Sequence, residues 1–228
     1  MIVLPILAAL IALAFGVQLL VRSGRRRAWH EAVWGVAMLM FAAASAALAL
    51  GVLDGWSAAE FRVYWLFGAI LNVPYLALGE AYLLVRRRWV GHVLLLIVLG
   101  ATAWASAEVR TAPLDVGVLR AEEFFAGREV LGEDAPARTL AFVYSYTGTA
   151  VLVLGILWSA LGMRGRPELR GRFYGTLLIA IGALIVAGGA AFAAAGNFAA
   201  FSVTLAVGVA GMYWGFLTAT GMPRRVAS

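Results

Sequence analysis

Seven stretches of about 20 residues that carry almost no charge constrain this chain more than any other feature of its sequence. A helix of about 20 apolar residues crosses the roughly 30 Å of hydrocarbon in a bilayer. Continuous apolar runs favour helices, because the strands of a membrane barrel alternate between apolar and polar residues. Helices also satisfy every backbone hydrogen bond within one segment in lipid. The predicted spans cover residues 2–21, 32–53, 63–85, 90–107, 140–163, 173–195 and 198–222, and only the third contains a charged residue, Glu80.

The overall composition agrees with this interpretation. Hydrophobic residues make up 63% of the 228 residues and charged residues 13%, whereas soluble domains average roughly 45–50% apolar and about 25% charged residues. We therefore expect an all-α, polytopic membrane protein whose single domain is a seven-helix bundle. Spans one to three and five to seven would run in matching directions, with span four as the link between two halves.

The few charges predict the orientation of the spans. Thirteen arginines and two acids, Glu31 and Glu168, fall on one side of the predicted membrane, and five arginines and nine acids fall on the other. These two sides carry +11 and −4, and Glu80 accounts for the rest of the net charge of +6. Short cytoplasmic loops retain arginine and lysine, so the N-terminus is predicted outside and the C-terminus in the cytoplasm. We expect a bacterial plasma membrane, with the arginines near anionic lipid headgroups rather than on nucleic acid.

Two absences from the composition exclude whole classes of chemistry. All 18 basic residues are arginine and there is no cysteine, so a lysine Schiff base and thiolate chemistry are both excluded. His30 and His92 are the only histidines, both near predicted cytoplasmic helix starts. They could clamp a haem iron or begin a metal site with Glu31, but they also suit an interface beside arginines. We expect no metal and no cofactor.

Small residues predict how some of the helices meet. Gly175, Gly182, Gly189 and Gly196 recur every seven residues in span six, and Gly211 and Gly215 form a G-x-x-x-G pair in span seven. Such spacing lets helix backbones approach closely in lipid. We expect tight packing here, including a homodimer through spans six and seven.

The longest connection, residues 108–139, lies on the predicted outer side. Apolar residues alternate with charged residues between 116 and 131, which is typical of a short helix lying in the headgroup region. Either an ordered cap or a solvated linker fits this pattern.

Glu80 is the principal candidate for a functional residue. Charged residues inside a span usually face the bundle interior or a water-filled cavity and take part in function. The competing interpretation is that Glu80 reaches the cytoplasmic interface or pairs with Arg86, Arg87 or Arg88, six to eight residues further on.

The same span carries Asn72, Pro74 and Tyr75 near its middle. Pro74 has no N–H to donate to the carbonyl of Ile70, which predicts a kink and an unpaired oxygen. Kinked helices build midplane sites in many transporters, although they also bend ordinary bundles. We therefore include Asn72 and Tyr75 with Glu80 in the predicted ligand site.

Aromatic residues of two other spans complete the candidate site. Tyr144 and Tyr146 begin span five from the outer side, and Tyr213 and Trp214 lie in span seven near the level of Glu80. Tyrosine and tryptophan also gather at membrane interfaces for structural reasons, which is the competing interpretation for these four residues.

These residues support three hypotheses of function. The first is an integral membrane protein that binds or transports a small ligand or ion between spans three, five and seven. The second is a sensor or assembly subunit with a partner at its cytoplasmic arginines, and the third is a lipid-modifying enzyme. The sequence contains no nucleophile elbow, P-loop or zinc-protease motif, so we favour a protein that is not an enzyme and has membrane lipids as its partners.

Overall fold

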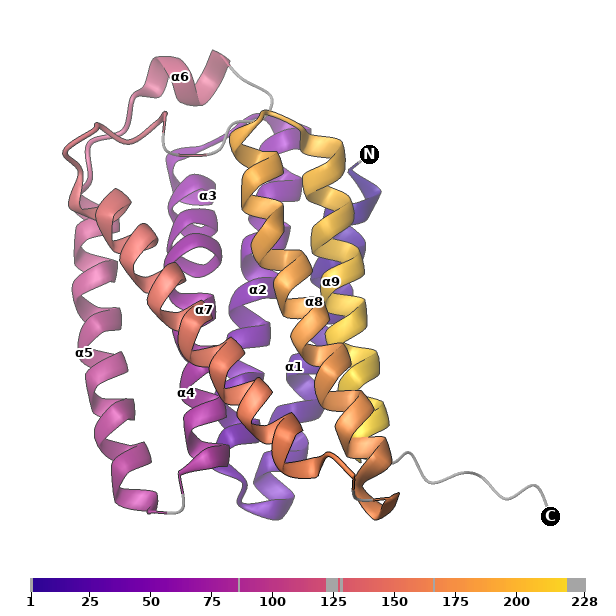
Figure 1. The fold of residues 1–228 in the computed structure, drawn as a ribbon. Helices are drawn as coiled ribbons and strands as arrows, with labels where there is room; N and C mark the ends of the chain where they lie inside the picture. Colours follow the sequence, from indigo (N-terminus) through magenta and orange to yellow (C-terminus); the bar gives the residue numbers. More distant parts are fainter. Residues whose placement is uncertain (1, 86, 122–126, 128, 166, 221–228) are drawn as a thin grey trace.

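The computed structural model describes residues 2–85, 87–121, 127, 129–165 and 167–220, and these form a bundle of helices (Figure 1). Seven helical segments within this part of the chain are long and apolar enough to cross a membrane. This confirms the predicted fold class. The elements are α1 (Val3–Arg26), α2 (Trp29–Asp54), α3 (Ala58–Val63), the π-helix η1 (Tyr64–Leu71), α4 (Asn72–Leu84), α5 (Arg88–Thr111), α6 (Val116–Ala121), α7 (Pro136–Met163), the 3-10 turn η2 (Pro167–Leu169), α8 (Arg170–Ala194) and α9 (Phe198–Thr220).

Most helices extend beyond the apolar runs that predicted them. α1 continues to Arg26 and α2 begins at Trp29, although the predicted spans stop at residue 21 and resume at residue 32. A helix is held by backbone hydrogen bonds, which do not stop where the first charged side chain appears. Consequently Arg22 and Glu31, which the sequence pattern leaves in a loop, lie inside helices.

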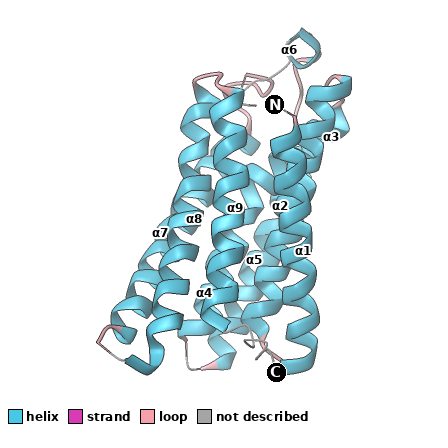
Figure 2. Ribbon diagram, turned by 90° about the vertical axis from the view of Figure 1, so that its right-hand side faces the viewer, coloured by secondary structure: helices cyan, strands magenta, loops and turns pink. Residues whose placement is uncertain are grey.

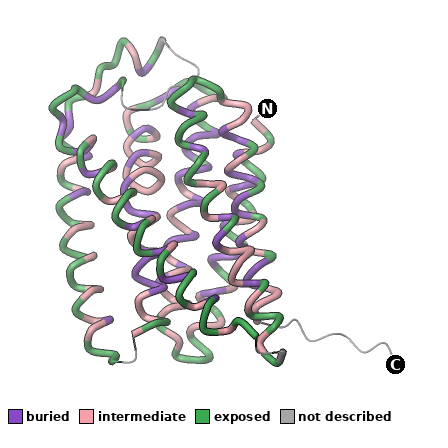
Figure 3. The backbone as a smooth tube through the Cα atoms, viewed as in Figure 1, coloured by how far each residue is buried: buried purple, intermediate pink, exposed green. Residues whose placement is uncertain are grey.

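Six of the seven spans form a closed ring. α1 packs on α2, α2 on α4, α4 on α7, α7 on α8, α8 on α9, and α9 returns to α1. α5 packs outside this ring against α4, η1 and α7, and it is the least buried of the spans. In Figure 3 the buried residues follow α2 and α4, while α5 is mostly intermediate or exposed. The span predicted to link two halves thus lies at the edge of the bundle.

Figure 2 shows the bundle from the side, with loops joining the helices at its two ends, and the residues at these ends differ in charge. At one end, α1, α4, α7 and α9 finish and α2, α5 and α8 begin. We call it the arginine-rich end, because Arg25, Arg26, Arg27, Arg87, Arg88, Arg164, Arg170 and Arg172 lie there. The connection that contains α6 lies at the opposite end (Figure 1).

The described part of this connection packs against the bundle as an ordered cap. The Asp115 carboxylate accepts hydrogen bonds from the N–H groups of Gly117 and Val118, which begins α6. Leu119 and Val130 are buried, at 3% and 1% exposed. Residues 122–126 and 128 of the predicted amphipathic stretch lie outside the described residues.

The glycines of the last two spans pack against each other within the chain. A Cβ added at Gly175 would lie 2.5 Å from the carbonyl oxygen of Gly215, and one at Gly182 would lie 2.5 Å from that of Gly208. Gly196 follows α8 with φ +69°, in the turn before α9. The glycine faces of α8 and α9 therefore cover each other within one chain. The predicted homodimer would have to form through other surfaces of these helices.

Candidate functional site

Span three changes its winding before it reaches the site. The π-helix Tyr64–Leu71 precedes α4, in which Pro74 lies near the start. In a π-helix each carbonyl pairs with the N–H five residues ahead, and the fifth residue after Ala69 is Pro74, which has none. Ser145 of α7 donates its hydroxyl to the Ala69 carbonyl at 2.7 Å. The sequence predicted an unpaired carbonyl at Ile70 from α-helical spacing. In the structure Ser145 instead reaches the adjacent carbonyl, that of Ala69.

A cavity of about 50 Å³ lies inside the ring, in the half nearer the arginine-rich end. Side chains from all six ring helices line it, and most of them are apolar. Glu80 is the only charged residue among them, and Ser159 and Thr176 contribute hydroxyl groups. The lining residues are Phe15, Leu19, Trp34, Met38, Leu76, Glu80, Leu83, Leu152, Ile156, Ser159, Thr176, Ile179, Met212 and Phe216.

Glu80 is buried at this cavity and lacks a compensating charge within the described chain. The residue is 3% exposed, and its Oε1 atom has no hydrogen-bond partner. No described arginine lies within ion-pair distance of its carboxylate, and Arg87 and Arg88 are exposed. Arg86 lies outside the described residues. The geometry thus agrees with a carboxyl facing the bundle interior rather than one that reaches the surface.

Glycine on α7 makes room for the Glu80 side chain. A Cβ added at Gly155 would lie 2.6 Å from Cγ of Glu80, closer than side-chain atoms approach each other. Seven residues earlier, a Cβ at Gly148 would lie 3.1 Å from the backbone nitrogen of Pro74. Two glycines on one face of α7 therefore allow α4 to approach at its proline and at its acid.

Trp34 of α2 forms another part of the cavity wall. Its indole nitrogen donates to the carbonyl oxygen of Leu76 at 3.0 Å, one helical turn before Glu80. The indole ring packs directly on Gly79, where a side chain would collide with it. This hydrogen bond fixes a large ring beside the carboxyl and restricts the space around it.

The other predicted residues of span three serve contacts outside the cavity. Asn72 is buried and donates its side-chain amide to the carbonyl of Ala37 at 2.7 Å, which ties α4 to α2. The hydroxyl of Tyr75 lies 3.2 Å from Thr102 Oγ1 on α5. Both residues hold the span that presents Glu80, but neither lines the cavity.

The four predicted aromatic residues lie at different depths in the bundle. Tyr213 stacks on Phe15 with ring centroids 5.0 Å apart and so supports the cavity wall. Tyr144 is partly buried at the edge of the core. Tyr146 and Trp214 are 66% and 64% exposed, on the outer surface of the ring. The structure therefore brings only Tyr213 close to the residues around Glu80.

The structure also reveals a second buried acid that the sequence interpretation assigned to a loop. Glu31 is 4% exposed, and its Oε1 atom lies 2.8 Å from Nε of Arg22. The arginine also covers the ring of Phe216, a cavity residue, at 5.2 Å from its centroid. The opposite charges of Arg22 and Glu31, which flank the short gap between the first two predicted spans, were the available signal for this pair.

The two histidines belong to separate aromatic groups near the arginine-rich end. His30 packs edge-on against Trp34, whereas Nδ1 of His92 lies 3.0 Å from the hydroxyl of Tyr82. No group of three or more histidine, aspartate or glutamate side chains in the described chain is placed to hold a metal ion.

The chemistry that the cavity can support follows from its donor set. Hard metal cations take about six or more oxygen ligands, whereas the cavity offers one carboxyl and two hydroxyl side chains. A proton needs only one carboxyl oxygen.

The chain matches no protein-family model, no curated protein and no solved structure, so the inference of function rests on this geometry.

Proposed function

We propose that this integral membrane protein binds a proton at Glu80 and moves it across the membrane. The single observation that supports this most strongly is the Glu80 carboxyl itself, 3% exposed at a cavity and without an ion pair in the described chain. A charge inside a membrane helix is costly, by up to about 2.5–3.5 kcal/mol at the helix centre on insertion scales. A bound proton removes that charge, so proton binding gives the buried acid a function.

The size of the cavity favours a proton over an organic ligand. Sites for small molecules usually enclose about 300–1,000 Å³, while this one encloses about 50 Å³. A cavity needs at least about 10–15 Å³ of volume open to a water-sized sphere to hold a water molecule, so this one has room for water. Water beside a carboxyl suits proton transfer.

The membrane and the orientation of the protein are part of the same proposal. We place the arginine-rich end in the cytoplasm of a bacterial cell because short loops that stay inside retain arginine. Glu80 then lies in the inner half of the bilayer, closer to the cytoplasm than to the outside.

A flux measurement in vesicles tests the proposal. The full chain is reconstituted into liposomes that contain a pH-sensitive dye, and a potassium diffusion potential drives proton entry. We expect Glu80→Gln, which keeps the shape but not the exchangeable acid, to lower the protein-dependent flux at least about tenfold, since a positioned proton-transfer group contributes at least about a hundredfold in enzymes. Tyr146→Phe and Trp214→Phe on the outer surface are matched controls and should retain the wild-type flux.

Two results would contradict the proposal. One is wild-type flux in Glu80→Gln, and the other is a wild-type flux no higher than that of protein-free vesicles. Either result would favour the hypothesis of a sensor or assembly subunit, in which Glu80 is structural.

A further inference from the structure

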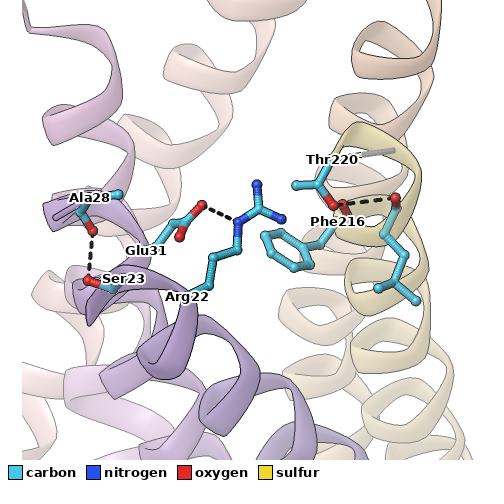
Figure 4. Close-up of polar contacts among 7 residues, drawn as sticks. Arg22, Ser23, Ala28, Glu31, Phe216 and Thr220 are labelled. Carbon is cyan, nitrogen blue, oxygen red and sulfur yellow. Dashed lines mark hydrogen bonds and ion pairs between the residues drawn. The ribbon is translucent and has the colours of Figure 1, made fainter. Parts of the chain in front are cut away.

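A second polar cluster lies beside the cavity, toward the arginine-rich end. Figure 4 shows Arg22 of α1 between Glu31 of α2 and Phe216 of α9. Nε of Arg22 lies 2.8 Å from Oε1 of Glu31, and its guanidinium lies over the Phe216 ring. Three ring helices therefore meet at one ion pair just outside the cavity.

The turn between α1 and α2 holds this pair in place. The Ser23 hydroxyl donates to the Ala28 carbonyl at 3.0 Å, which closes the turn (Figure 4). Arg27 adopts a left-handed backbone conformation at the end of α1, with φ 52°. Arg22 and Glu31 thus face each other from neighbouring helices joined by a short, fixed connection.

The cluster contains buried oxygen atoms that the ion pair does not use. Glu31 is buried, at 4% exposed, and its Oε2 atom has no hydrogen-bond partner among the described residues. The same holds for Oε1 of Gln18, one helical turn before Arg22. A buried acceptor without a donor costs free energy comparable to a lost hydrogen bond, and a proton or a water molecule supplies that donor.

Two cavity residues connect the cluster to Glu80. Phe216 lines the cavity on one side and carries Arg22 on the other. Trp34 follows Glu31 by three residues on α2 and also lines the cavity, so both side chains project from neighbouring turns of one helix face. Glu31 is therefore linked to the cavity wall through Trp34 on its own helix and through Arg22, which covers Phe216.

We propose that Glu31, held by Arg22, is a second proton-binding carboxyl that exchanges protons between the arginine-rich surface and Glu80. This inference rests on the proposed function of Glu80. A hydronium ion at the surface gives a proton to Oε2 of Glu31, which forms an O–H bond. That bond breaks when the proton passes to a water on the cavity side, which in turn protonates the Glu80 carboxylate. Glu31 returns to the carboxylate paired with Arg22.

The charged and titratable groups around Glu31 suit this role. α1 contributes the positive charge of Arg22, and α9 (Phe198–Thr220) has no charged residue and contributes the Phe216 ring beneath the guanidinium (Figure 4). On α2 itself, His30 packs against Trp34. Glu80 of α4 lies at the cavity, and Tyr82 of α4 and His92 of α5 both pack on Trp29 of α2. Arg22 is thus the partner that stabilises the carboxylate after each transfer.

Rapid-mixing infrared spectroscopy on the reconstituted chain tests the inference. After a drop in pH, the C=O stretch of the protonated Glu80 carboxyl, identified by its loss in Glu80→Gln, is followed in time. We expect Glu31→Gln to slow the rise of this band at least about tenfold and to leave its final amplitude unchanged. Thr218→Ala, near the same end of α9, removes an exposed hydroxyl that bonds to the Trp214 carbonyl of its own helix, and it should keep the wild-type rate.

A double variant separates proton exchange from a structural role. Glu31→Gln leaves Arg22 buried without its partner, which can destabilise the protein. Arg22→Gln combined with Glu31→Gln removes both charges and keeps two polar side chains. If Glu31 exchanges protons, the double variant stays slow even when thermal unfolding shows restored stability.

Three results would overturn the inference. They are a wild-type rate in Glu31→Gln, a rate restored by the double variant, and a band whose final amplitude falls together with its rate. Failure of the proposed function is seen separately in the vesicle assay, as wild-type flux in Glu80→Gln or as no flux above protein-free vesicles, and this inference would fall with it.

Discussion

Two helix interfaces of this protein use the same glycine spacing for opposite purposes. Between α8 and α9, glycines seven residues apart bring backbone against backbone, as at Gly182 and the carbonyl oxygen of Gly208. Between α7 and α4, Gly148 and Gly155 are also seven residues apart, but Gly155 faces the side chain of Glu80. The first interface is a close helix contact, and the second is a helix contact that accommodates an acid.

The difference shows what a small residue contributes in a membrane bundle. Lipid provides no hydrophobic force between helices, so close packing and interhelical hydrogen bonds hold them together. At α8–α9 the glycines carry no side chains, so the two helix backbones come into van der Waals contact. At α7 the contact is supplemented by the bond from Ser145 to the Ala69 carbonyl of η1, and the space gained at Gly155 is filled by the Glu80 side chain.

The largest effect is expected when the backbone contact is broken. In Gly182→Ala the new Cβ would lie 2.5 Å from the Gly208 carbonyl oxygen and 2.8 Å from the Met212 nitrogen, and neither backbone atom can rotate away. We expect a loss of about 2–3 kcal/mol in stability, typical of overpacking. Thermal unfolding in detergent measures it.

Gly188→Ala on the same helix is the matched control, because nothing lies within 4 Å of its added Cβ. It should unfold at the wild-type temperature or slightly above it, since alanine favours helix over glycine by up to about 1 kcal/mol. Equal destabilisation by both substitutions would show that α8 does not depend on this contact.

A smaller effect on stability is expected at the second interface. In Gly155→Ala the new Cβ meets Cγ of Glu80, which belongs to a side chain that can rotate. We expect a loss of about 1 kcal/mol, together with a proton flux lowered by displacement of the carboxyl. Gly162→Ala, with open space around its Cβ, is the control for both measurements. Unchanged flux in Gly155→Ala would mean that the position of Glu80 is not critical.

The smallest effect is expected from the hydrogen bond between α7 and η1. Ser145→Ala leaves the Ala69 carbonyl without this donor, and interhelical hydrogen bonds in membranes average about 0.6 kcal/mol. Thr147→Ala is the comparison, because its exposed hydroxyl bonds only to Val143 of its own helix. Unfolding temperatures should rank Ser145→Ala below Thr147→Ala, and the reverse order would argue against the Ser145 contact.

The sequence predicted much of the fold because the hydrophobicity of each span by itself indicates that the span lies in lipid. Uncharged runs of about 20 residues indicate helices in lipid without any knowledge of their neighbours. The boundaries were less accurate at α1 and α2, where the helices continue past Arg22 and start before Glu31. Charge is a good marker of where the hydrocarbon ends, but it does not mark where helical hydrogen bonding ends.

The candidate site could be predicted only in part, because facing directions depend on the partners of each helix. Glu80 was found from its residue type alone, since an acid in a span is rare. Tyr146 and Trp214 were chosen by depth, yet both are exposed on the outside of the ring. Their residue types fit a site and a lipid interface equally well, and only packing separates the two.

The sequence by itself determined the solvent of this protein, the helical fold of its seven spans and the presence of one acid among them, because these properties depend on local hydrophobicity. The tertiary structure decided that six spans close into a ring, that α5 stays outside it, and that Glu31 and Arg22 meet beside the cavity. These features depend on contacts between residues far apart in the chain. No local pattern specifies such contacts, because several arrangements of similar apolar helices satisfy the same backbone and solvent requirements.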